Sequence, residues 1–379
     1  MKSLAFAFFL LALAAQPVWP LDHVAFRRDG REQSVAGQVN VRAEDGGILL
    51  MARDGALWAI EPGELDKQRE DDEPFQPYSR DELGKQLLAE MPAGFELHST
   101  HHYLICHNTS REYAQWCGSL FERLYKGFAN YWSRKGVKLH DPEFPLVALV
   151  FNTPQAYAQY SRAELGDAAE SVIGYYSLRS NRITMYDLTG VESLRRPGDR
   201  RGSSAQINRL LDRPEAEQLV ATVIHEATHQ IAFNSGMQTR FADVPLWASE
   251  GLAMYFETPD LQSAKGWRTI GAVNSNRLNR FREYLSHRPS DSLKSLICDD
   301  KRIRDTLTAL DAYAEAWALN YYLIHHHPKQ YLAFLQMLGR KGQMLWDDPA
   351  TRLREFQEAF GDNLAQLDAD FLRQMQKVR

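Results

Sequence analysis

The residues with the clearest chemical potential are two histidines four positions apart, in the string His225-Glu226-Ala227-Thr228-His229. The apolar spacing around them predicts a helix, and four residues turn a helix by about 400°. His225 and His229 therefore project about 40° apart from one side of the helix, where both imidazoles can bind one zinc ion. Glu226, next to the first histidine, can reach a water on that ion without being a ligand.

Twenty residues separate His229 from a candidate third ligand. Glu250 lies in the otherwise apolar stretch Trp247–Ala253. An ionised carboxylate in such surroundings is costly unless it is paired or coordinates a metal, and a catalytic zinc needs three protein ligands and one open position. We therefore expect Glu250 to complete the set. Glu257 on the same helix is a candidate for holding a ligand histidine in place.

The H-E-x-x-H helix followed by W-x-x-E-G-L-A resembles the gluzincin zinc metallopeptidases. It is most similar to the peptidase-MA-like group of secreted bacterial proteins, many of them uncharacterised. The resemblance covers about residues 100–335, and its specific part is residues 220–257. It implies a zincin-like core, in which a small sheet precedes the active-site helix.

The resemblance also implies a zinc-activated water that attacks a peptide carbonyl, with Glu226 as general base. The ligands of one Zn²⁺ per chain would be His225, His229 and Glu250. Gluzincins often supply a second oxyanion donor from a later helix, and Tyr313 in the segment 312–317 is the matching candidate. Simple packing of Tyr313 in a helix over 306–326 is the alternative.

The small sheet is expected to end in a hairpin. Ser180-Asn181 is a turn signal between the apolar runs 172–178 and 182–188. By the resemblance, the last strand (182–188) would line the cleft and pair with an extended peptide.

Composition changes along the chain indicate its organisation. An apolar run of ten residues, Leu4–Leu13, follows Lys2 and is typical of a cleaved signal peptide. Asp-Gly pairs between short apolar runs predict β-hairpins, and an acidic, proline-containing stretch follows them. We expect an α+β protein with a signal peptide at about 1–20, a small antiparallel β module at 21–62, a linker at 63–94, and a zincin-like metallopeptidase domain with a helical C-terminal region at 95–379.

The overall charge argues against a nucleic-acid partner. Forty-four basic and 49 acidic residues give a net charge of −5, so no global positive field exists. No stretch after the signal approaches the roughly 20 apolar residues that a membrane span needs. With the predicted signal peptide, this favours a secreted or periplasmic protein. By the resemblance, its partner would be a peptide or protein substrate. The N-terminal module leaves room for association with the cell envelope.

Several alternatives stay open. Cys106 and Cys117 could form a disulfide and leave Cys298 alone, or all three could be buried thiols. Residues 189–213, rich in arginine, are expected to form a long flexible loop sensitive to proteases. No aminopeptidase-type recognition motif is visible, which favours endopeptidase action. A zincin-fold binding protein without turnover, or a zinc hydrolase of a non-peptide amide, would also suit the motifs.

Overall fold

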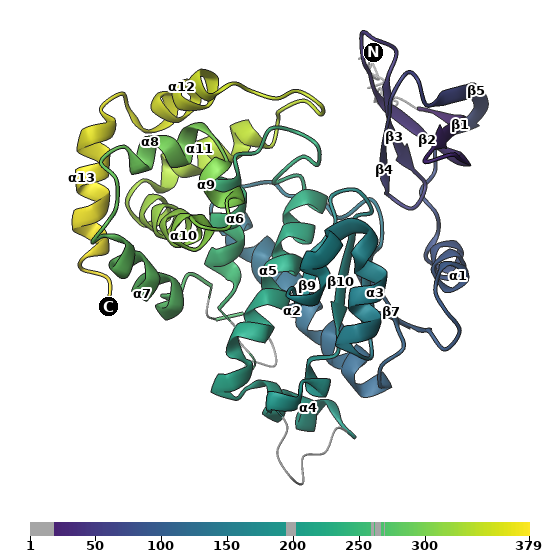
Figure 1. Ribbon diagram of the computed structural model, residues 1–379, viewed down its shortest axis with the longest axis horizontal. Helices are drawn as coiled ribbons and strands as arrows, with labels where there is room; N and C mark the ends of the chain where they lie inside the picture. The colour runs from purple at the N-terminus through teal and green to yellow at the C-terminus, as the bar shows by residue number, and fades with distance from the viewer. Residues whose placement is uncertain (1–18, 195–201, 259–260, 262–266, 269) are drawn as a thin grey trace, which may run out of the picture. The chain divides into compact units, whose positions relative to one another are not determined.

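The computed structural model (Figure 1) shows an α+β protein, as predicted. It divides into two compact units, Met1–Pro77 and Tyr78–Arg379. The structure describes residues 19–194, 202–258, 261, 267–268 and 270–379. The predicted signal peptide therefore lies outside the described residues, except for residues 19 and 20.

The first unit is a single antiparallel sheet with the strand order β4-β3-β2-β1-β5. Its strands are β1 (Pro20–Arg28), β2 (Arg31–Arg42), β3 (Ile48–Ala52), β4 (Leu57–Ile60) and β5 (Leu65–Pro74). Asp29 and Gly30 join β1 to β2 and both have positive φ angles, 52° and 72°, which a tight two-residue hairpin requires. One face of the sheet buries Val24, Phe26 and Leu50.

Residues 63–94 differ from the linker that their composition predicts, because they contain β5 and the helix α1 (Arg80–Glu90). β5 pairs with β1 along the edge of the first sheet, but none of its side chains is buried. An edge strand held by backbone hydrogen bonds needs no apolar alternation, so its sequence looks like that of a solvated linker. In the second unit, α1 begins at a capping box of Ser79 and Glu82 and buries Leu83 and Leu87.

The second unit is built on a mixed sheet with the order β6-β7-β8-β10-β9. Its strands are β6 (Glu96–Ser99), β7 (Tyr103–His107), β8 (Leu146–Phe151), β9 (Gly174–Tyr176) and β10 (Arg182–Tyr186). β7, β8 and β10 run parallel, and the edge strands β6 and β9 are antiparallel to their neighbours. The predicted hairpin at Ser180-Asn181 is confirmed, and Asn181 takes the left-handed conformation with φ of 61°.

Helices cover both faces of this sheet. The long helix α2 (Arg111–Arg134) and α5 (Glu217–Asn234) pack on one face, whereas α1 and α3 (Pro154–Leu165) pack on the other. Successive residues of β7 alternate between the two cores: Ile105 faces α2, and Leu104 faces α1. The continuous apolar runs of the inner strands follow from this burial on both faces.

The strand expected to line the cleft is internal. β10 pairs with β8 on one side and β9 on the other, so its backbone hydrogen-bonding groups are already used. β9 is the edge strand instead. Only three residues long, β9 carries too few residues for a periodic signal in the sequence.

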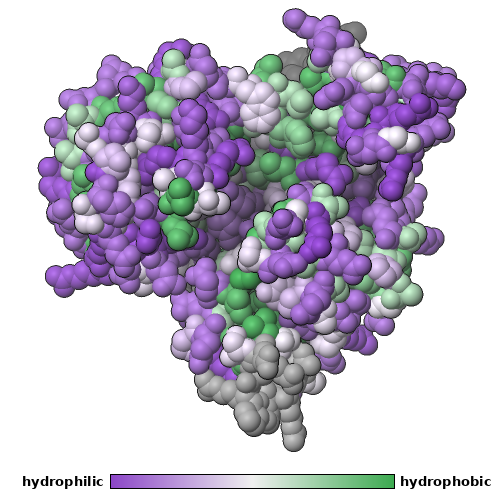
Figure 2. Space-filling model, in the orientation of Figure 1, coloured by the Kyte–Doolittle hydropathy of each residue, from purple (hydrophilic) through white to green (hydrophobic). Residues whose placement is uncertain are grey.

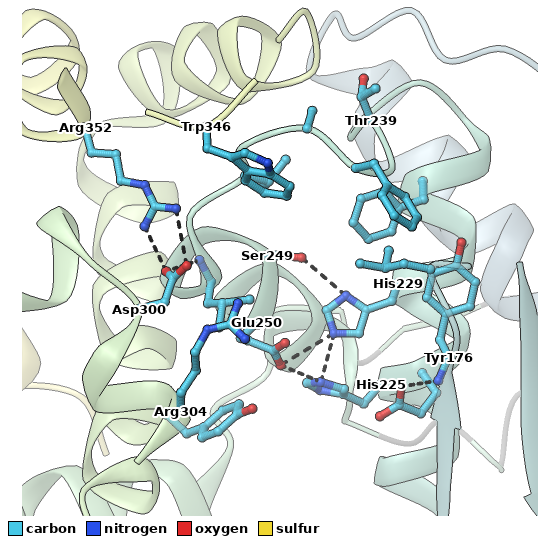
Figure 3. A pocket seen from close by; sticks show the side chains of 18 residues that line it. Tyr176, His225, His229, Thr239, Ser249, Glu250, Asp300, Arg304, Trp346 and Arg352 are labelled. Carbon is cyan, nitrogen blue, oxygen red and sulfur yellow. Dashed lines mark hydrogen bonds and ion pairs between the residues drawn. The ribbon is translucent and has the colours of Figure 1, made fainter. Parts of the chain in front are cut away.

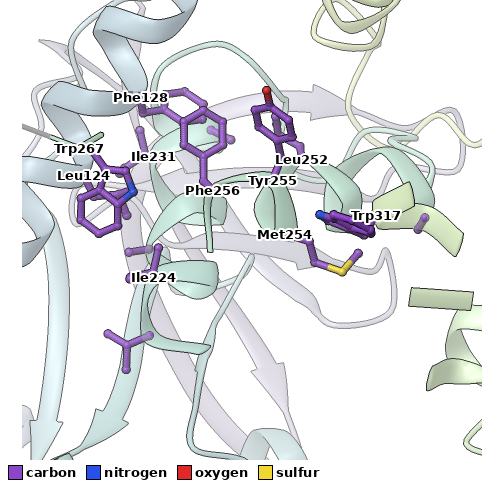
Figure 4. Close-up of a cluster of buried hydrophobic side chains, with 14 of the residues drawn as sticks. Leu124, Phe128, Ile224, Ile231, Leu252, Met254, Tyr255, Phe256, Trp267 and Trp317 are labelled. Atoms are coloured by element: carbon purple, nitrogen blue, oxygen red, sulfur yellow. The ribbon is translucent and has the colours of Figure 1, made fainter. Parts of the chain in front are cut away.

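The rest of the second unit is helical. After α5 come α6 (Leu246–Phe256), α7 (Ser275–Tyr284), α8 (Ser292–Cys298), α9 (Lys301–Arg304), α10 (Ala309–His326), α11 (Pro328–Leu338), α12 (Pro349–Phe360) and α13 (Leu364–Met375). Figure 4 shows how the core joins these parts: Phe128 of α2 and Ile231 of α5 meet Phe256 of α6, and Trp317 of α10 lies near Met254.

The arginine-rich segment 189–213 is not one long loop. Its described part holds the helix α4 (Ser204–Leu211), capped by Ser203, with Ile207, Leu210 and Leu211 buried. These three residues have the spacing i, i+3 and i+4, which forms one face of a helix. The prediction of a loop relied on the arginines around them and overlooked this spacing. Residues 195–201 lie outside the described residues.

All three cysteines are free thiols, and Cys106 and Cys117 are buried. In the part of the chain that the structure describes, no helix combines the length and the apolar character that crossing a membrane requires.

Candidate metal centre

Helix α5 points its two histidines toward α6 because its opposite side is apolar and buried. Val220, Ile224 and Ile231 are buried in the core, which turns the other side of the helix toward α6. The chain leaves the helix after Asn234, where Gly236 has a φ of 79°. Such a glycine is a common helix stop, and the predicted end of the helix is confirmed.

Helix α6 carries Glu250 and packs closely on α10 at Gly251. A Cβ atom at Gly251 would lie 1.8 Å from Nδ2 of Asn320. That amide donates hydrogen bonds of 2.8 Å to the carbonyl oxygens of Trp247 and Ala316. The glycine after Glu250 therefore allows the two helices to approach, and the approach fixes where Glu250 points.

The three predicted ligands meet at one point (Figure 3). Nε2 of His225 lies 3.1 Å from Nε2 of His229 and 3.0 Å from Oε2 of Glu250, and Nε2 of His229 lies 3.5 Å from that same oxygen. All three ligand atoms lie within 4.8 Å of one another. Both histidines are buried. This cluster could hold a metal ion.

The far side of the His225 ring is held by a carboxylate. Nδ1 of His225 lies 3.1 Å from Oε2 of Glu257, and the other oxygen of Glu257 accepts hydrogen bonds from Asn274 and Arg277. Since an ionised carboxylate only accepts hydrogen bonds, the proton of His225 belongs on Nδ1. Its Nε2 atom then presents a lone pair to the cluster.

A second chain of contacts orients His229. The Ser249 hydroxyl donates a hydrogen bond of 3.1 Å to Oε1 of Gln238. Its oxygen is then free to accept from Nδ1 of His229, 3.4 Å away. With both Nδ1 atoms protonated, two Nε2 lone pairs and one carboxylate oxygen face the same gap. Three acceptors with no donor between them repel one another unless a cation joins them.

The protonation preferences of the cluster agree with this demand for positive charge. Burial lowers the pKa of His225, but hydrogen bonds to Glu250 and Glu257 outweigh it and raise the pKa to about 10. Burial likewise opposes ionisation of Glu250, yet the charges of the two histidines and their hydrogen bonds hold its pKa far below the usual range. A proton on the histidines and a metal ion satisfy the same electrostatic need.

Glu226 stands beside the cluster without joining it. Its Oε2 atom accepts a hydrogen bond of 2.8 Å from the backbone N–H of Tyr176 at the end of β9. Burial raises the pKa of Glu226, although the neighbouring histidines oppose the shift. A carboxylate with a raised pKa is suited to accept and return a proton.

Tyr313 of α10 lies in the same cavity as the cluster. The charge of Glu250 and burial both raise the pKa of Tyr313, so the phenol keeps its proton and can donate a hydrogen bond. The guanidinium of Arg277 lies 5.8 Å from the centre of its ring. Tyr313 is thus placed in the cavity as well as packed in its helix.

One cavity of about 490 Å³ connects these groups. Figure 2 shows a hollow on this face of the second unit, between the helices around α10 and the region of β9 and β10. Besides the residues already described, its wall includes the aromatic side chains of Phe233, Phe241 and Trp346 and the arginines Arg304 and Arg352.

Comparison with known proteins adds a family match. Residues 219–344 match a family described as a protein of unknown function (DUF1570). The matched segment contains all three predicted ligands, Glu226 and Tyr313. No curated protein matches the chain.

Sequence reasoning identified the cluster but missed most of its surroundings. Gln238, the backbone donor at Tyr176 and the cavity residues Arg304 and Trp346 belong to segments without a motif, and Ser249 occupies an unspecified position of the W-x-x-E string. Only Glu257 carried a signal, as a charged residue on an apolar helix.

Proposed function

We propose that this chain is a zinc-dependent peptidase. The observation that carries the proposal is the convergence of two imidazoles and one carboxylate, with Glu226 and Tyr313 on the wall of the same cavity. Two histidines and one glutamate form a ligand set found in catalytic zinc sites, where a fourth position stays open. The resemblance to gluzincins points the same way.

The donor atoms suit zinc. Neutral imidazole nitrogens and one carboxylate oxygen match its preference, whereas calcium and magnesium favour oxygen ligands alone. His225, His229 and Glu250 would hold the ion. When bound, zinc supplies a Lewis acid that polarises a carbonyl and makes water a good nucleophile near neutral pH.

The protein's own groups would handle the protons. Oε2 of Glu226 is held by the N–H of Tyr176, which leaves Oε1 to take a proton from the attacking water and to pass it to the leaving nitrogen. The protonated phenol of Tyr313 would donate a hydrogen bond to the carbonyl oxygen as negative charge develops there.

An extended peptide would pair along β9. Its outer edge has no strand partner among the described residues, and Tyr176 at its end lines the cavity. Strand addition of this kind aligns a peptide backbone by main-chain hydrogen bonds. We therefore assign the pairing with a peptide to β9, and not to β10, the strand expected from the sequence.

The cellular setting remains part of the proposal. The predicted signal peptide favours a secreted or periplasmic location. The first unit, Met1–Pro77, would then be available to associate with the cell envelope.

The first experiment measures the zinc content of the purified mature protein after metal reconstitution. We expect one zinc per chain in the wild type and in Glu226→Gln, and none in His229→Ala. His101→Ala, which changes an exposed histidine outside the cavity, is the matched control and should keep its zinc. A wild-type protein that takes up no zinc would refute the proposal.

The second experiment separates turnover from binding. Wild-type protein is incubated with a peptide library, and cleavage should disappear in Glu226→Gln. Zinc binding without cleavage would favour a zincin-fold binding protein. Cleavage confined to a library of non-peptide amides would favour the amidohydrolase alternative.

A further inference from the structure

The charged side chains that line the cavity differ in whether they already have a partner. Each of its three carboxylates already has a partner: Glu226 accepts from the N–H of Tyr176, Glu250 contacts the two histidines, and Asp300 binds Arg352 at 3.0 Å. Ionised groups in a partly enclosed site are costly unless paired, so these pairings are the expected state.

The two arginines on the wall differ. Arg352 is buried and divides its guanidinium between Asp243, at 2.6 and 3.0 Å, and Asp300. Arg304 is exposed and has no hydrogen bond or ion pair from its side chain to any described residue. Its charge acts on the cavity all the same, because it lowers the pKa of Tyr313 against the larger effect of Glu250.

The backbone that presents Arg304 is firmly anchored. Arg304 is the last residue of the short helix α9, which follows the paired Asp300. The preceding Ile303 is buried, and Arg302 binds the buried carboxylate of Glu315 at 2.9 Å. Figure 3 shows the Arg304 side chain extending into the cavity near Glu250. The guanidinium of Arg304, presented from the end of this anchored helix, can pair with a carboxylate in bidentate geometry.

We propose that Arg304 binds a carboxylate of the substrate, so that the site prefers peptides with an acidic side chain or a free terminal carboxylate near the scissile bond. The aromatic side chains of Phe233, Phe241 and Trp346 also line the cavity and suit an apolar side chain of the substrate. Arg304 is then a specificity residue. This inference rests on the proposed function, since it assumes that the substrate is held at the metal cluster.

The test uses peptide hydroxamates, which bind a catalytic zinc without being cleaved. Two series carry the hydroxamate at the amino end or at the carboxyl end, so that both peptide directions are sampled. With the hydroxamate at the amino end, leucine is followed by Glu-amide, by Gln-amide or by glutamine with a free terminal carboxylate. With the hydroxamate at the carboxyl end, leucine hydroxamate is preceded by acetyl-Glu or by acetyl-Gln, so that only the side-chain carboxylate is sampled. Binding to the zinc-loaded full chain is measured by calorimetry at low and high salt.

In at least one series, we expect a carboxylate ligand to bind wild-type protein about fivefold more tightly than its uncharged match, the size of one partly screened ion pair. The preference should shrink as salt increases, disappear in Arg304→Gln and persist in part in Arg304→Lys. The exposed Arg134→Gln, outside the cavity, is the control and should keep it. If the ligand with a Glu side chain binds more tightly, Arg304 recognises an acidic side chain. If the ligand with a free terminal carboxylate binds more tightly, Arg304 recognises the end of the peptide.

Two outcomes would overturn the inference. One is equal affinity for charged and uncharged ligands in both series of zinc-loaded wild-type protein. The other is a preference that survives in Arg304→Gln. Either result leaves the proposed function standing, whereas a protein that takes up no zinc refutes the proposed function and this inference together.

Discussion

Nδ1 of His225 lies 3.1 Å from Oε2 of Glu257, on the opposite side of the ring from Nε2, the atom that faces His229 and Glu250. Asn274 and Arg277 bind the other oxygen of Glu257, so the carboxylate that orients the ligand is itself held. The ring orientation of His225, in the middle of α5, is therefore set by a contact with Glu257, the residue that follows α6.

The first prediction concerns this contact. In Glu257→Gln, the amide is a weaker acceptor and can rotate to present a donor, so the tautomer of His225 is no longer enforced. We expect zinc affinity to fall about 10- to 100-fold, measured by competition with a chromophoric chelator. Glu122→Gln breaks a similar pair, His102–Glu122 at 2.8 Å, outside the cavity. It should leave zinc affinity unchanged, and a loss of similar size there would contradict the prediction.

The second prediction concerns Tyr313. Replacement by phenylalanine removes the hydroxyl and keeps the ring, so packing in α10 is retained. On a cleaved peptide, kcat should fall about 10²- to 10³-fold, with little change in KM and full zinc content. Tyr321→Phe, on the same helix but outside the cavity, should behave like wild type. An unchanged kcat in Tyr313→Phe would show that this tyrosine only packs.

The third prediction tests the close approach of α6 and α10. In Gly251→Ala, the new methyl group would meet Asn320 and the carbonyl oxygen of Ala316, 2.8 Å away. Relief requires movement of the helices, and we expect a loss of about 1–3 kcal/mol in the free energy of unfolding. Thermal denaturation measures it. Gly190→Ala, where the nearest atom lies at 3.7 Å, is the control. Equal melting temperatures for Gly251→Ala and wild type would refute the packing argument.

The fourth prediction is a pH dependence in the first unit. The Arg28 guanidinium, 2.7 Å from Glu64, holds the pKa of Glu64 at about 2, below its ordinary 4.5. A depressed carboxyl pKa contributes stability that is present above pH 4.5 and is lost as the pH falls toward 2. Because both side chains are partly exposed, the contribution should be below about 1 kcal/mol.

Amide hydrogen exchange in β1 and β5 can detect this contribution without unfolding the whole chain. Glu64→Gln should exchange faster than wild type at pH 6, and the difference should narrow at pH 3. Asp66→Asn, whose ion pair with Arg27 spans 3.9 Å, serves as the weakly paired control. A difference that widens at low pH would contradict the sign of the prediction.

The sequence by itself determined the local part of the cluster of His225, His229 and Glu250. His225, Glu226 and His229 lie within five residues of one helix, and helical geometry alone places the two imidazoles on one side. The glutamate at position 250 stood out because charge is rare on so apolar a helix. The hairpins of the first unit also followed from local turn chemistry at Asp29-Gly30.

Only the tertiary structure decided what surrounds that cluster. Tyr176 and Arg304 reach the cavity from segments that are distant in sequence, and Gln238 reaches Ser249 from a connection after α5. None of these segments carries a periodic signal of its own. The sequence also did not predict the edge strand β5, whose side chains are all at least partly exposed, or the helix α4, which lies among arginines. Both elements are stabilised by contacts with other parts of the chain. A motif records chemistry that one helix can arrange, whereas a cavity is formed by packing between elements, which no single stretch of the chain specifies.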